Sequence, residues 1–144
     1  MRYARQTAAA LALAIIVCGM AACNDYVTSS YKTLAVMGTA YNSTMSAMAE
    51  AYSDGLIDDE AKADIIKAGN IFYASYHTAR IALATYAAVI EASDNATDNA
   101  TDSAESLKAS LAAALSTAQK NLTSLKSVYS TVMALITSNS TEED

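Results

Sequence analysis

The sequence of 144 residues has no proline and no tryptophan, and it has only four glycines, two cysteines and one histidine. Without proline, a helix is not interrupted by a residue that lacks the backbone N–H. Two cysteines are too few for the multi-bridge framework that stabilises many small exported domains. The sequence also contains neither a Gly-rich phosphate loop nor a G-x-S-x-G nucleophile elbow, which excludes these two kinds of enzyme site.

Positive charge is scarce as well. Nine Lys and Arg residues stand against fifteen Asp and Glu residues, so the formal net charge is −6. The basic residues form no patch, and nucleic acid is therefore not an expected partner. Apolar residues make up 53% of the chain, which is enough for one domain with a core. Ala, Ser, Thr and Leu dominate, and this composition favours long helices over strands.

The N-terminal segment has the three parts of an export signal. Arg2 and Arg5 form a positive region, Ala8 to Val17 form a short apolar stretch, and small residues follow at 19–22. The apolar stretch is shorter than the ~20 residues of a membrane-spanning helix. We therefore expect residues 1–22 to be a signal peptide.

The end of this segment, Met20-Ala21-Ala22-Cys23, resembles the lipobox of bacterial lipoproteins. The resemblance implies that Cys23 carries diacylglycerol on its thiol, that the chain is cleaved before Cys23, and that the membrane is a partner through this lipid. Cys18 fits the pattern poorly, because the preceding Val17 is β-branched. Two alternatives stay open, namely an ordinary signal peptide cut near Ala21 or Ala22, and an uncleaved anchor.

The resemblance also bears on location. It places the protein on the outer side of the cytoplasmic membrane. In a Gram-negative cell, Asn24 is not the Asp that is associated with retention in the inner membrane, so the periplasmic face of the outer membrane is favoured. Removal of the signal also removes Arg2 and Arg5, which leaves seven basic against fifteen acidic residues, or a charge of −8.

The remaining chain is predicted to contain a tether, three helices and a tail. Residues 23–30 are short and polar and predict a tether after the lipidated cysteine. Apolar or small residues then recur in steps of three and four, in one seam from Tyr31 to Tyr52 and another from Ile65 to Ile90 that includes Phe72 and Ala79. This spacing predicts helices over 31–53, 59–92 and 103–137. Residues 138–144 form an acidic tail that we expect to be disordered. The predicted bundle thus occupies 31–137.

Short connections between these helices predict an all-α, antiparallel up-down-up three-helix bundle with coiled-coil-like seams. If the chain turns back at residues 54–58, residues of the first two helices lie level with each other when their numbers sum to about 113. Gly38 is then expected to meet Tyr76. If the chain turns back at the DNATDNAT segment, residues 94–101, level residues of the second and third helices have numbers that sum to about 197. Gly69 is then expected to lie beside Tyr129. Each pair sets a small residue against a large one, as close packing requires. The same register places the start of the first helix beside the second loop.

Few residues point to chemistry. His77 is predicted to lie at the flank of the bundle, and neither a metal site nor a cofactor is expected. The chain is therefore interpreted as a non-enzymatic envelope lipoprotein with a structural or protein-interaction role, and its partner is an unknown envelope protein. Two alternatives remain: a surface lipoprotein encoded by a phage or mobile element, and a helical module that binds a small apolar ligand in a groove lined by tyrosines.

Overall fold

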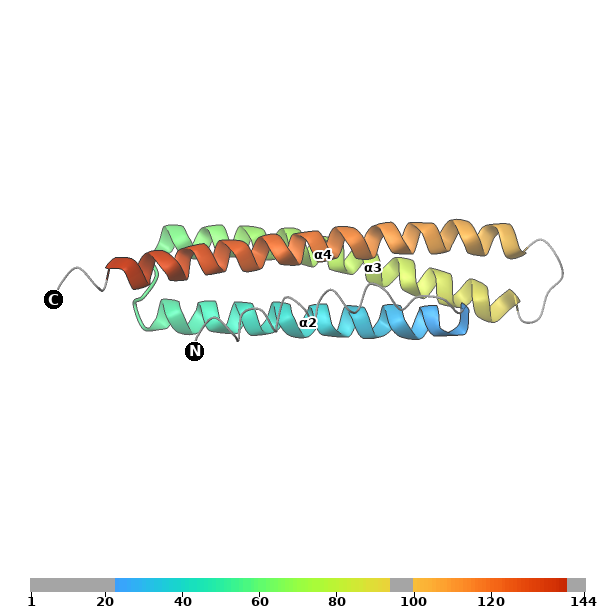
Figure 1. Cartoon of the computed structure of the whole chain (residues 1–144), viewed down its shortest axis with the longest axis horizontal. Coiled ribbons are helices and arrows are strands. Elements are labelled where there is room, and N and C mark those ends of the chain that lie inside the picture. The colour runs from blue at the N-terminus through green and yellow to red at the C-terminus, as the bar shows by residue number, and fades with distance from the viewer. Residues whose placement is uncertain (1–22, 94–99, 140–144) are drawn as a thin grey trace.

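A computed structural model describes residues 23–93 and 100–139, which form three helices (Figure 1). Helix α2 runs over Cys23–Ser53, α3 over Asp59–Ser93 and α4 over Ala100–Asn139. The described residues contain no strand, and the prediction of an all-α three-helix bundle is confirmed. The predicted signal peptide, residues 94–99 of the predicted loop and residues 140–144 of the predicted tail lie outside the described residues.

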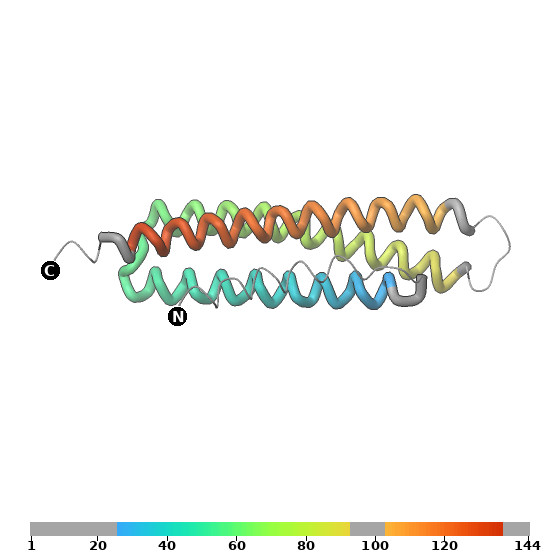
Figure 2. Tube along the Cα trace, in the orientation of Figure 1, coloured from blue at the N-terminus to red at the C-terminus, as the bar shows by residue number. Residues whose placement is uncertain are grey.

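The helices run up, down and up, as the tube in Figure 2 shows. The turn at 54–58 and the end of α4 lie at one end of the bundle, while the start of α2 lies toward the other end, where α3 ends and α4 begins (Figure 1). Helix α3 makes its most extensive contact with α4, and α2 packs on both, more on α3 than on α4. The predicted orientation of the three helices is therefore correct.

Helix α2 begins earlier than the sequence predicts. The segment 23–30, which was expected to be a tether, is helical, and Tyr26 and Ser30 within it are buried. These two residues extend the buried stripe of Leu34 toward the N-terminus at a helical spacing of four. Burial of the Tyr26 ring stabilises the added turns. Helix α4 likewise begins at Ala100 and ends at Asn139, beyond both predicted bounds of 103–137.

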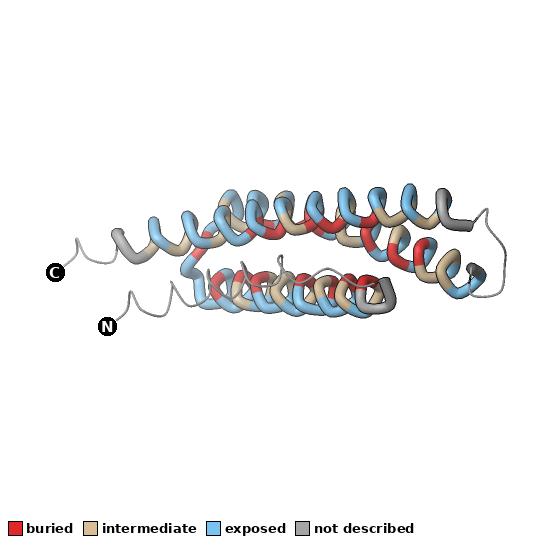
Figure 3. The backbone as a smooth tube through the Cα atoms, turned by 45° about the vertical axis from the view of Figure 1, so that its right-hand side comes forward, coloured by how far each residue is buried: buried red, intermediate tan, exposed pale blue. Residues whose placement is uncertain are grey.

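The core lies along the facing stripes of the three helices, which are red in Figure 3. Most predicted seam positions of α3 are buried, including Ile65, Phe72 and Ala79. The predicted seam of α2 is wrong at both ends, because Tyr31 is 68% exposed and Tyr52 is 37% exposed. The buried stripe of α2 is shifted by about one position from the predicted seam, and it is made of Tyr26, Ser30, Leu34, Met37, Thr44, Met48 and Ala51.

The turn between α2 and α3 is closed by backbone hydrogen bonds around Gly55. The N–H of Leu56 donates to the carbonyl of Ala51 at 2.8 Å, and the N–H of Gly55 donates to the carbonyl of Tyr52 at 3.1 Å. These two bonds are the Schellman motif, which needs a left-handed residue. Gly55 supplies it with a φ of +71°. Ile57, only 6% exposed, anchors the turn to the core.

Asp58 caps the start of α3, the position that aspartate favours at a helix start. Its carboxylate Oδ1 accepts a hydrogen bond of 2.8 Å from the backbone N–H of Ala61. Asp59 and Glu60 add negative charge to the first turn, where the helix dipole is positive. The Asp59 carboxylate also accepts a bond of 2.8 Å from the hydroxyl of Tyr52, which joins the two helix ends.

We expect Asp58→Ala to lower the free energy of unfolding by about 0.5–2 kcal/mol, because an N–H of the first turn loses its partner. Asp64→Ala is the matched control, since Asp64 is an exposed aspartate of the same helix that caps nothing. Urea unfolding of both variants gives the difference. Equal stability of the two variants would show that the Asp58 cap does not contribute.

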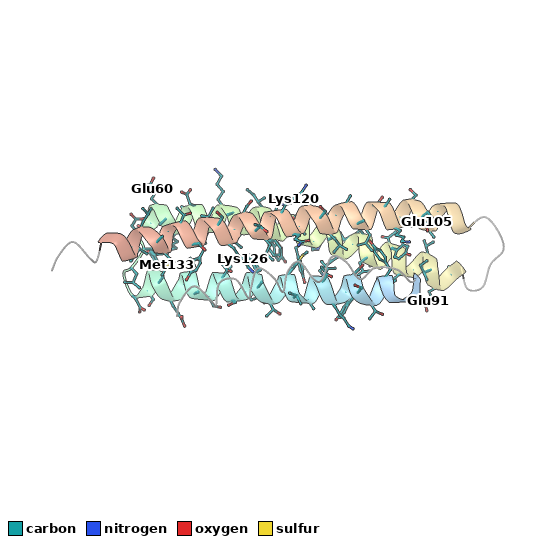
Figure 4. The ribbon with its side chains drawn as sticks, in the orientation of Figure 1. Glu60, Glu91, Glu105, Lys120, Lys126 and Met133 are labelled. Atoms are coloured by element: carbon teal, nitrogen blue, oxygen red, sulfur yellow. The ribbon has the colours of Figure 1, made fainter. Side chains whose placement is uncertain are left out.

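Charged and hydroxyl side chains cover much of the outer surface. Glu60 and Lys120 protrude from the bundle in Figure 4, and the remaining charged residues labelled there are also exposed. Many Ser and Thr hydroxyls donate to the carbonyl four residues earlier, as Thr33 does to Ser29 at 2.9 Å. This pairing satisfies the hydroxyls within their own helix. None of the three described helices combines the length and apolar character needed to cross a membrane.

Candidate functional site

Cys23, the predicted lipidation residue, is the first residue of α2. The other three lipobox positions, Met20, Ala21 and Ala22, lie outside the described residues. Cys23 is therefore at the end of the bundle where α3 ends and α4 begins (Figure 1). A lipid on this residue would be attached to the folded helix without an intervening linker.

A cluster around Tyr26 fixes this end of α2. The Tyr26 ring meets the ring of Tyr86 on α3 edge to face, with centroids 5.7 Å apart. The ammonium of Lys108 on α4 lies 5.7 Å from the Tyr26 ring centroid. Burial raises the pKa of Tyr26 above its usual range, while the nearby Ser30 hydroxyl and Lys108 partly oppose this shift. One side chain of α2 thus contacts both other helices, three residues after Cys23.

The structure brings Gly38 and Tyr76 together, as the register predicts. A Cβ atom placed on Gly38 would lie 2.9 Å from the hydroxyl oxygen of Tyr76, closer than real contacts allow. Tyr41 and Phe72, whose numbers sum to 113, stack with their centroids 5.1 Å apart. These contacts agree with the antiparallel register of α2 and α3.

The predicted pairing of Gly69 with Tyr129 is wrong. The atoms nearest to a Cβ placed on Gly69 belong to Met45 and Tyr41 of α2, with the Met45 sulfur at 3.2 Å. The prediction used one stripe of α3 for both neighbouring helices. In the structure, Gly69, Phe72 and Tyr76 all meet α2. Tyr129 is half-buried against the core.

An open cleft of about 590 Å³ lies between the first half of α2 and the second half of α3. Its walls include Val27, Tyr31, Leu34, Tyr76, Arg80 and Leu83. We call it the α2/α3 cleft. It begins one helical turn after Cys23, and Arg80 is the only charged residue among its walls.

His77 is exposed, as expected for a residue at the flank of the bundle. Within residues 23–93 and 100–139, no group of three His, Cys, Asp or Glu side chains could hold a metal ion. The described part of the chain therefore presents two features for function: the helix that begins at Cys23 and the α2/α3 cleft.

Sequence reasoning missed the role of two residues, Tyr26 at the start of α2 and Arg80 in the cleft. Tyr26 was assigned to the tether, although its spacing to Ser30 and Leu34 continues the apolar stripe and could have shown the earlier helix start. Arg80 carried no signal, because a single arginine on a polar face is common. Only the pairing of α2 with α3 shows that it borders an apolar cleft.

Comparison with protein-family models, curated proteins and solved structures gives no match to this chain.

Proposed function

We propose that this protein is a bacterial envelope lipoprotein, held through a lipid on Cys23 to the outer side of a membrane. In this proposal the helical bundle has a structural or protein-interaction role and no catalytic one. The lipobox-like sequence before Cys23 supports the anchor. The observation that carries the proposal is the lipobox-like Met20-Ala21-Ala22-Cys23, which comes directly before a segment whose Tyr26 is buried in the bundle.

The geometry of α2 defines how the bundle would stand on the membrane. Tyr26 meets Tyr86, and these numbers sum to 112, so Cys23 lies level with residue 89 (112 − 23 = 89). Helix α3 continues to Ser93, four residues further, which is about 6 Å at 1.5 Å per residue. A lipid on Cys23 would therefore keep this end of the bundle close to the headgroups, while the 54–58 turn points away from the membrane.

Exposed apolar side chains support an interaction role. Six large ones are more than half exposed, namely Tyr31, Val36, Ile71, Tyr73, Ile81 and Leu135. All of them except Leu135 lie on α2 and α3. Large exposed apolar side chains mark a site for another protein where they lie together on one face. The partner in this proposal is an envelope protein that covers part of α2 and α3. In a Gram-negative cell, Asn24 favours the outer membrane as the place of contact.

Replacement of the lipid-bearing residue tests the anchor. We expect Cys23→Ser to leave an uncleaved precursor that incorporates no labelled fatty acid, because serine has no thiol to accept the diacylglycerol. Cys18→Ser is the matched control, since it removes the other cysteine of the chain and we expect it to be processed and labelled like the wild type. Cells are fed an alkyne fatty acid and the protein is isolated. Label that persists in Cys23→Ser would contradict the proposal.

A further inference from the structure

The α2/α3 cleft combines an apolar wall with unused hydrogen-bond donors. Val27, Leu34 and Leu83 contribute apolar surface, while Tyr31, Tyr76 and Arg80 contribute donors. The hydroxyls of Tyr31 and Tyr76 make no hydrogen bond to any described residue. Arg80 makes no ion pair in the described part of the chain. The polar side chains of the cleft are therefore one guanidinium and the hydroxyls of Tyr31, Tyr76 and Thr28, with no carboxylate.

The charge of the cleft is opposite to that of the whole protein. No acidic residue is among its walls, although the chain carries fifteen acidic residues against nine basic ones. A guanidinium presents paired N–H groups that match the two oxygens of a carboxylate. Tyr76 lies four residues before Arg80, on the same face of α3. Both side chains line the cleft.

We propose that the α2/α3 cleft binds a free long-chain fatty acid, with the carboxylate at Arg80 and Tyr76 and the alkyl chain along Val27 and Leu83. This inference goes beyond the proposed anchor and does not depend on it. The thioether-linked diacylglycerol expected at Cys23 has no anionic group for Arg80. Charge complementarity therefore favours a separate anionic amphiphile over the protein's own lipid.

The dimensions of the cleft suit this ligand. Its walls on α3 extend from Tyr76 to Ala87, eleven residues or about 16 Å along the helix. The volume of about 590 Å³ lies in the range of small-molecule sites, which is about 300–1,000 Å³. Arg80 and Tyr76 lie toward one end of the cleft, while the wall nearer to Cys23 is mostly apolar, with the hydroxyl of Thr28 as its polar group. The alkyl chain would therefore point toward the start of α2.

Photolabelling of the full-length protein in membranes of cells that make it tests the proposal. The probe is a palmitic acid analogue with a free carboxylate and a diazirine in its alkyl chain, and adducts are located by mass spectrometry. We expect adducts on peptides that contain residues 27–35 and 83–87. Unlabelled palmitate should compete at least about tenfold better than hexadecanol, because the alcohol cannot form the charged pair.

Three variants sharpen this test. We expect Arg80→Gln to reduce labelling about tenfold, whereas Lys67→Gln, the same charge change on the same helix, leaves it unchanged. Ala84→Trp places a large ring in the cleft from an exposed wall position, and we expect it to abolish labelling without lowering the unfolding temperature. Equal competition by hexadecanol, full labelling of Arg80→Gln, or adducts elsewhere in the chain would overturn the proposal. Labelling that appears only in Cys23→Ser would assign the cleft to the protein's own acyl chain and would also overturn it.

Discussion

Phe72→Ala is expected to lower the free energy of unfolding by about 3–5 kcal/mol, the largest effect of any single substitution considered in this bundle. Phe72 is the only phenylalanine and is 1% exposed. Its ring stacks on Tyr41 with a centroid distance of 5.1 Å and lies 5.5 Å from the ring of Tyr76. Truncation leaves a cavity between α2 and α3 and removes both ring contacts.

Tyr73→Ala is the matched control for this substitution. Tyr73 is the next residue on α3, but it is 55% exposed, and its nearest aromatic contact is Tyr41 at 6.3 Å. We expect it to change the free energy of unfolding by less than about 1 kcal/mol, as for most surface substitutions. Urea unfolding measures both variants. An equal loss of unfolding free energy in the two variants would mean that the buried ring of Phe72 stabilises the bundle no more than the exposed ring of Tyr73.

Gly38→Leu is expected to lower the free energy of unfolding by about 1–3 kcal/mol, because the new side chain overpacks a closed contact. Even its Cβ would lie 2.9 Å from the Tyr76 hydroxyl oxygen. Helix propensity acts in the opposite direction, since replacement of glycine in a helix gains somewhat less than about 1 kcal/mol. We expect the packing loss to exceed this gain, since the ring of Tyr76 is itself held against Phe72.

The double variant Gly38→Leu/Tyr76→Ala separates these two effects. Removal of the ring makes room for leucine. We therefore expect the double variant to lose about 0.5–3 kcal/mol less unfolding free energy than the two single variants lose together. The propensity gain does not depend on Tyr76 and cancels in the cycle. A coupling energy near zero, or a stabilised Gly38→Leu, would contradict the register of α2 and α3.

The sequence predicts the three helices and their order because the apolar residues recur at a strict helical spacing. The turn could also be predicted in detail, since Gly55 and Asp58 are a C-terminal and an N-terminal helix signal only three residues apart. The facing of Gly38 and Tyr76 follows from the length of this turn, because a short turn fixes which residues of two antiparallel helices are level.

Two parts of the structure could not be predicted in this way. Gly69 was assigned to α4 because an alanine-rich helix offers several stripes of small residues, and spacing alone does not show which stripe meets which neighbour. The start of α2 was missed because Asn24, Asp25 and Thr28 give the segment a polar composition. Its helix is stabilised by the contact of Tyr26 with Tyr86, sixty residues away in the chain. The local composition of the segment cannot predict a contact with so distant a residue.

The cleft is formed by side chains of both α2 and α3. Its walls therefore depend on how the two helices pair, and the sequence alone indicates only that a groove lined by tyrosines is possible. Tyr31 was placed in the seam, whereas it stands 68% exposed at the edge of the cleft. Tyr31 and Tyr76 line the cleft, while Tyr86 is buried in the core.

The central claim, a helical bundle anchored by a lipid at its first residue, is tested most directly by the intact mass of the protein extracted from its membrane. We expect a chain that begins at Cys23 and carries the added mass of at least a diacylglycerol on this residue. A chain that retains residues 1–22, or one that begins elsewhere and carries no lipid, would contradict it.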